Sequence, residues 1–169
     1  KGFLPPPYND VEALEEIRII LFEGMDREVA EEIAAGTEEV FDVAVEVIEE
    51  TLDLPESGYD EERQQYVASG LITVLPEGDP GQKTLGITDA DLYARDLNFV
   101  FGQAQLPGDR AVMSIARLRE EFWGNEPDRG LLIERGVKEA VHELGHTLGL
   151  RHCDNPDCVM HFSNSLADT

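Results

Sequence analysis

The sequence predicts an α/β fold (α+β in some schemes) built on one mixed β-sheet. Short runs rich in β-branched residues alternate with amphipathic stretches of helical period, which favours a mostly parallel sheet. A Pro-Gly-Asp turn at residues 107–109 joins two of these runs directly, which favours one antiparallel strand. With 169 residues, 41% of them hydrophobic, the chain is expected to form one domain with a substantial core.

Five strands are expected, each a short run dominated by branched or aromatic side chains: residues 17–23, 43–48, 83–87, 97–101 and 110–115. Three helices are expected where apolar residues recur every three or four positions: residues 26–42, 61–75 and 131–148. Loops are expected at residues 51–60 and 119–129. Three consecutive prolines predict an extended lead-in over residues 1–10, and a short helical turn is expected over residues 11–16.

The charge of the chain is strongly one-sided, with 36 acidic residues, 13 basic residues and a formal net charge of −23. Such a chain repels phosphate groups, so we expect no nucleic-acid partner. The acidic residues are spread along the whole chain, which favours adaptation to a salty cytoplasm, as in a salt-adapted archaeon. The alternative is an acidic surface that attracts cationic peptides.

The chain shows no targeting or membrane-spanning segment. No apolar run approaches 18 residues, so no membrane partner is expected. Cys153 and Cys158 stand beside histidines at a metal-ligand spacing, which favours a reducing cytoplasm over a disulfide framework. No signal peptide is visible, and Lys1 is not a natural start, so an N-terminal segment is expected to be missing from the sequence. A monomer is expected.

All four histidines and both cysteines lie within residues 142–161, which indicates a metal site. On a helix, His142 and His146 are four positions apart and share a face, which we expect to lie opposite the apolar face. Two imidazoles at this spacing can chelate zinc. Gly149 permits a left-handed turn that can bring back His152 as a third ligand, leaving one coordination position for water.

Glu143 lies beside the expected metal, where a carboxylate can accept a proton from metal-bound water. The alternative is a set of surface histidines at a helix end with no metal, and the placement of Gly149 and His152 argues against it. His161 fits no ligand spacing and is expected at the surface. Two aromatic pairs are expected to pack rather than to line a substrate pocket: Phe99 with Phe101, and Phe122 with Trp123.

The run from His142 to His152 resembles the metzincin clan of zinc peptidases, whose pattern is His-Glu-x-x-His-x-x-Gly-x-x-His followed by a methionine turn. Within the clan, the sequence is similar to archaemetzincin, which continues with Cys, four residues, Cys, one residue and Met. Cys153, Cys158 and Met160 match that continuation without a gap. Residues 86–89, 97–102 and 162–168 are also archaemetzincin-like, so the resemblance covers most of the chain after about residue 17.

The resemblance implies a metzincin-like zincin, with a twisted mixed sheet and an active-site helix above the cleft. Within a single domain over residues 1–169, it implies an N-terminal subdomain of about residues 1–149 and a small C-terminal subdomain of about residues 150–169. It also implies the roles of five residues: zinc binding by His142, His146 and His152, general base and acid catalysis by Glu143, and support beneath the metal by Met160.

A second, structural zinc is also implied by the resemblance. Cys153 and Cys158 would provide half of its ligands, and a later Cys-x-x-Cys pair, expected beyond Thr169, would provide the rest. A disulfide between the two cysteines is the alternative. Some metzincins have a tyrosine two residues after the methionine, whereas this sequence has Phe162, which has no hydroxyl group.

The sequence therefore predicts a zinc-dependent peptidase that hydrolyses peptide or protein substrates. The alternative is a zinc-containing peptide-binding or scaffold protein with little turnover. Glu143 favours the enzyme, because metal binding alone does not need it. We expect an extended peptide to bind along an edge strand within residues 97–105.

Overall fold

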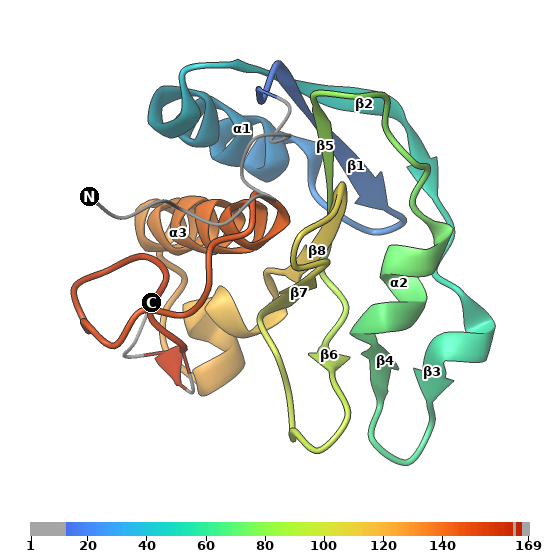
Figure 1. The fold of residues 1–169 in the computed structure, drawn as a ribbon. Coiled ribbons are helices and arrows are strands. Elements are labelled where there is room, and N and C mark those ends of the chain that lie inside the picture. The colour runs from blue at the N-terminus through green and yellow to red at the C-terminus, as the bar shows by residue number, and fades with distance from the viewer. Residues whose placement is uncertain (1–12, 164, 167–169) are drawn as a thin grey trace.

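The computed structural model describes residues 13–163, 165 and 166, and it is organised around a five-stranded sheet (Figure 1). The strands of this sheet are β1 (Glu16–Phe22), β2 (Ala44–Leu52), β5 (Gln82–Thr88), β7 (Gly102–Ala104) and β8 (Arg110–Ser114). Their order is β2-β1-β5-β8-β7, and every pair is parallel except β7 with β8. The predicted mixed sheet with one antiparallel strand is confirmed.

The sheet separates two apolar cores. The α-helices that cover it are α1 (Arg27–Phe41), α2 (Ala68–Val74) and α3 (Arg129–Thr147). Along β1, Ile19 and Leu21 enter the larger core with α1 and α3, which lie side by side in Figure 1. Ile20 and Phe22 enter the smaller core with α2. Because successive side chains of a strand point to opposite faces, β1 is buried on both sides, as expected for the interior of a parallel sheet.

A second, three-stranded sheet lies beside α2 and consists of β3 (Tyr59–Asp60), β4 (Gln65–Val67) and β6 (Leu92–Tyr93). The helix predicted over residues 61–75 is therefore wrong in its first half. The chain turns back at Gln64, which has a φ of 55°, so that β4 pairs antiparallel with β3. The predicted loop at residues 51–60 is also shorter, because β2 includes Thr51 and Leu52 and a 3-10 turn occupies Glu56–Gly58.

The strand predicted over residues 97–101 is wrong. Val100 makes only an isolated bridge to Leu92, and regular pairing begins at Gly102. The rings of Phe99 and Phe101 instead pack edge to face with their centroids 5.3 Å apart. The Arg117 guanidinium lies 4.1 Å from the centroid of the Phe99 ring. Aromatic packing and single hydrogen bonds to distant residues, not regular strand pairing, position this segment.

The other predicted elements agree with the structure. Residues 17–23, 43–48, 83–87 and 110–115 correspond to β1, β2, β5 and β8, and residues 26–42 and 131–148 correspond to α1 and α3. Both long helices begin at an aspartate N-cap: Asp26 accepts from the N–H groups of Glu28 and Val29, and Asp128 from that of Leu131. Two 3-10 turns, Ala116–Leu118 and Glu120–Trp123, precede α3, and the second lies in the predicted loop at residues 119–129.

Two predictions concern the start of the chain. The extended lead-in over residues 1–10 lies outside the described residues, as do the first two residues of the helical turn predicted at 11–16. Residues 13–15 have no regular secondary structure. Within the part of the chain that the structure describes, no helix has the length and apolarity needed to cross a lipid bilayer.

Candidate metal centre

The last two turns of α3 carry two of the predicted ligands and are buried on every side. His142 and His146 are each 7% exposed, and every residue from Glu139 to Thr147 is buried. We expected the histidines to point out of the helix face opposite the apolar face, but in the structure both faces of this part of α3 are buried. The segment after α3 folds back over the histidines, and the carbonyl groups of Leu150 and Val159 contact them.

A tight turn follows α3 at Gly149, whose φ of 94° lies in the left-handed region that favours glycine. The N–H of Gly149 donates to the carbonyl of His146 at 2.9 Å, and the N–H of Leu150 donates to that of Gly145 at 3.0 Å. This turn reverses the chain and brings His152 beside the two helical histidines.

The three imidazole rings converge through their Nε2 atoms. The Nε2 atoms of His142 and His146 are 3.1 Å apart, and those of His146 and His152 are 3.2 Å apart. In a tetrahedral site with Zn–N bonds of about 2.0–2.1 Å, two ligand atoms are separated by about 3.3 Å. Within the described residues, these three histidines are the one group of His, Cys, Asp and Glu that meets the spacing of a metal site.

The Nδ1 atoms of the two helical histidines face backbone carbonyls. His142 Nδ1 lies 2.7 Å from the Val159 carbonyl oxygen, and His146 Nδ1 lies 2.7 Å from that of Leu150. Since a carbonyl only accepts, each Nδ1 carries the proton and each Nε2 presents its lone pair. Burial, with smaller effects from His146 and His152, lowers the pKa of His142 to about 4, so this ring stays neutral, as a metal ligand must.

Glu143 lies on the same helix and forms a buried carboxyl pair with Glu139, one turn earlier. Their residues are 4% and 5% exposed, and their side chains share a hydrogen bond. Burial raises the pKa of Glu139 to about 7. Burial first, and the Glu139 charge second, raise the pKa of Glu143. Oε2 of Glu143 is buried and has no hydrogen-bond partner among the described residues, and Glu143 lines the cleft.

Sequence analysis did not identify Glu139 as part of the site. Its four-residue spacing from Glu143 was the available indication, because residues at this spacing are neighbours on a helix. An acidic pair at that spacing is usually solvated, and only the structure shows that this one is buried.

Met160 lies beneath the histidine-bearing turn of α3 and is 6% exposed. A Cβ atom added to Gly145 would lie 2.7 Å from the Met160 sulfur, so a larger residue there would force the flexible end of the Met160 side chain to move. The N–H of Cys153 donates to the Met160 carbonyl at 2.9 Å and joins the start of the C-terminal segment to its end. Met160 therefore packs against the turn of α3 that lies between the two helical histidines.

Cys153 and Cys158 are half-buried free thiols in this segment. His161 is partly exposed, with Nδ1 2.9 Å from the Cys153 carbonyl, and it does not belong to the histidine group that meets the spacing of a metal site. The ring of Phe162 tilts against that of His152 at a centroid distance of 5.1 Å. Phe162 therefore covers one side of the third predicted ligand.

The histidines open into a cleft of about 640 Å³. β7 borders this cleft, as do both carboxyl groups of the buried pair. Phe99 and Phe101 pack together and also line the cleft, so packing and pocket roles coincide for this pair. Phe122 and Trp123 do not line it; they pack against each other on the surface. Arg151, which sequence analysis did not single out, is the only lysine or arginine among the described lining residues.

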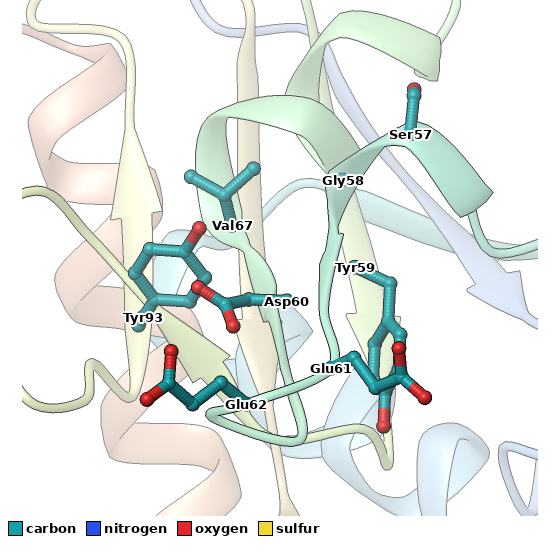
Figure 2. A pocket seen from close by; sticks show the side chains of 8 residues that line it. All are labelled: Ser57, Gly58, Tyr59, Asp60, Glu61, Glu62, Val67 and Tyr93. Atoms are coloured by element: carbon teal, nitrogen blue, oxygen red, sulfur yellow. The ribbon is translucent and has the colours of Figure 1, made fainter.

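A second depression of about 640 Å³ lies at the small sheet, and Figure 2 shows its lining. Tyr59, Val67 and Tyr93 contribute its larger side chains. The carboxylates of Glu61 and Glu62 point to different sides of the loop between β3 and β4. None of the residues that line this depression belongs to the histidine group that meets the spacing of a metal site.

The fold and the site together define a metzincin-like zincin. The helix carries two converging histidines, a third histidine follows a glycine turn, and a methionine lies beneath them. The sheet is mixed and has an antiparallel edge strand. Comparison with known proteins agrees. The profile of Peptidase family M54 matches residues 8–169, and the chain belongs to this family.

Archaemetzincins are among the similar proteins. The archaemetzincin of Methanocaldococcus jannaschii is 48% identical over 117 residues, which are 69% of this chain and 64% of that protein. The alignment thus spans a little less than two thirds of the relative. The crystal structure of Archaeoglobus fulgidus archaemetzincin complexed with malonate superposes with a TM-score of 0.79 at 40% identity, covering 90% of this chain and 89% of that one. A zinc-dependent peptidase from Methanocorpusculum labreanum gives a TM-score of 0.79 at 29% identity, covering 90% and 91%.

Proposed function

We propose that this protein is a zinc-dependent peptidase that hydrolyses peptide or protein substrates. The observation that carries the proposal is the convergence of three Nε2 atoms at tetrahedral spacing beside a buried glutamate with a free carboxylate oxygen. His142, His146 and His152 would hold the zinc. The membership in family M54 and the similarity to archaemetzincins support the same function.

The residues of the site divide the chemistry between them. Zinc, when bound, supplies a Lewis acid that polarises the scissile carbonyl, lowers the pKa of the attacking water and favours the ionised form of the neighbouring carboxylate. Glu143 accepts a proton from the attacking water at Oε2 and returns it to the nitrogen of the leaving amine. The Val159 and Leu150 carbonyls keep His142 and His146 in the tautomer that presents Nε2.

The substrate backbone would lie along β7, the edge strand of the sheet. Gly102, Gln103 and Ala104 all line the cleft. Since only β8 pairs with β7 in the described sheet, the other edge of β7 can hydrogen-bond to an extended peptide.

A second zinc would be bound in part by Cys153 and Cys158. Their thiols are free and half-buried, and four residues separate them. A closed structural zinc site requires four ligands, so two further ligands would complete it. This metal would stabilise the segment that carries Met160.

Replacing Glu143 by alanine tests the main proposal. The zinc-loaded wild type should hydrolyse members of a broad peptide library, and Glu143→Ala should keep its zinc and lose about 10²–10⁴-fold in rate, the usual contribution of a general base. Glu134→Ala is the matched control, because Glu134 lies on the same helix but is exposed. Peptide binding by the wild type without turnover would instead support the scaffold function and refute the peptidase.

A further inference from the structure

Arg151 occupies a constrained position at the edge of the metal centre. The carbonyl of the preceding Leu150 contacts His146 Nδ1 at 2.7 Å, and the following residue, His152, places its Nε2 atom 3.2 Å from that of His146. The backbone is therefore held on both sides of Arg151. Its side chain is exposed and lines the cleft.

Most arginines of this acidic chain pair with carboxylates. Those with a carboxylate partner are Arg27, Arg63, Arg110, Arg117, Arg119, Arg129 and Arg135. Arg18 donates to the Thr84 hydroxyl. Among the residues that the structure describes, Arg95 and Arg151 have neither a carboxylate nor a hydroxyl partner, and of these two only Arg151 lines the cleft. With 36 acidic side chains available, an arginine without an internal carboxylate partner leaves its guanidinium available to a ligand.

We propose that Arg151 recognises a carboxylate group of the peptide substrate close to the scissile bond. The proposal rests on the proposed peptidase function and names the substrate class of the same site. A guanidinium binds a carboxylate through two parallel hydrogen bonds, which gives directional selection. The cleft itself offers no competing partner, because its carboxylates, Glu139 and Glu143, are buried and hydrogen-bonded to each other.

The net charge of −23 opposes this selection at long range, since the chain repels an acidic peptide. Salt separates the two effects. At about 1 M salt the Debye length is about 3 Å, so long-range repulsion is screened while a hydrogen-bonded contact pair persists. In concentrated potassium chloride, the preference of Arg151 for a carboxylate should therefore be opposed least by the repulsion between the acidic chain and an acidic peptide.

The test uses zinc-loaded protein in about 1 M potassium chloride and one cleavable peptide sequence. Peptides carry Glu, Gln or Lys at each position that flanks the cleaved bond, and each is made with a free or an amidated C-terminus. The wild type should prefer a carboxylate by about 10-fold in kcat/KM, consistent with hydrogen bonds to a charged group. The peptides with Glu, Gln or Lys beside the cleaved bond test recognition of a side-chain carboxylate. The peptides with a free or amidated C-terminus test recognition of a terminal carboxylate.

Arg151→Gln should reduce the ratio of kcat/KM between the Glu and Gln peptides, or between the acid and the amide, from about 10-fold to near one. Arg95→Gln is the matched control and should keep the wild-type ratio, because Arg95 is exposed outside the cleft lining. An equal loss on all peptides, or an unchanged ratio, would overturn the proposal. Zinc content and circular dichroism establish that both variants fold.

Binding to Glu143→Ala separates this proposal from the peptidase function. Fluorescence anisotropy with the same labelled peptides should show the carboxylate preference and its loss in the Glu143→Ala, Arg151→Gln double variant. If no peptide is cleaved but this preference is present, the Arg151 proposal stands and the peptidase fails. If peptides are cleaved and no preference appears in either assay, the peptidase stands and Arg151 does not select carboxylates.

Discussion

Replacing Glu139 by glutamine should stabilise the zinc-free protein at alkaline pH. Glu139 is 5% exposed and shares a hydrogen bond with Glu143. Glutamine has nearly the same shape, and its side-chain carbonyl can still accept a hydrogen bond from the Glu143 carboxyl group, but it cannot ionise. The substitution therefore removes one buried titration and leaves the packing in place.

The magnitude follows from the pKa of Glu139, which burial raises from 4.5 to about 7. Since the folded pKa exceeds the unfolded one, the folded state binds more protons between these values. The free energy of unfolding therefore falls as the pH rises through this range and levels off above pH 7. One pKa unit corresponds to 1.36 kcal/mol, so the ionised Glu139 costs about 3 kcal/mol of stability at pH 8.5.

The assay is urea or thermal unfolding of the zinc-free wild type and Glu139→Gln between pH 4.5 and pH 8.5. The variant should gain about 3 kcal/mol at pH 8.5, or roughly 6–12 °C in Tm, and the gain should shrink towards zero at pH 4.5. Glu134→Gln, on the exposed side of the same helix, is the control and should show no such trend. A pH-independent difference, or a loss of stability at pH 8.5, would refute the reasoning.

Two further predictions concern the proposed ligands. A non-cleavable peptide inhibitor should pair with the free edge of β7 (Gly102–Ala104) in a co-crystal structure, and an inhibitor lying elsewhere would exclude that binding mode. Metal analysis of the fully loaded protein should give two zincs per chain, and Cys153→Ser should lose one and leave the histidine site loaded. A single zinc in the fully loaded wild type would contradict the second site.

The three histidines could be predicted from the sequence because their approach depends on local backbone geometry. The neighbourhood of His142 and His146 follows from the helix alone, because a spacing of four residues places two side chains on one face. The approach of His152 needs only one more local event, the left-handed turn at Gly149. Strand β1, which is buried on both faces along most of its length, could likewise be predicted from a short run of branched residues.

The missed elements depend on contacts between distant segments. Residues 61–65 are mostly good helix formers, yet they join a hairpin because β4 also pairs with β6. Gln65 Nε2 donates to the Asp91 carboxylate and to the Asn98 carbonyl, both at 2.9 Å. These bonds span 26 and 33 residues, so local propensity could not predict them. The same contacts hold the segment before β7 in place without making it a strand.

Glu139 and Arg151 show why a motif alone does not define a site. Each lies within three residues of a predicted ligand, and neither residue type at that position indicates a role. Glu139 gains its significance from burial between α3 and the elements around it, because a buried carboxyl pair cannot ionise twice without cost. Arg151 gains its significance from its place in the cleft and from the ion pairs of most other arginines, because an arginine without a carboxylate partner is informative only once those pairs are known. Both residues are identified by their environment, which depends on the packing of the whole chain.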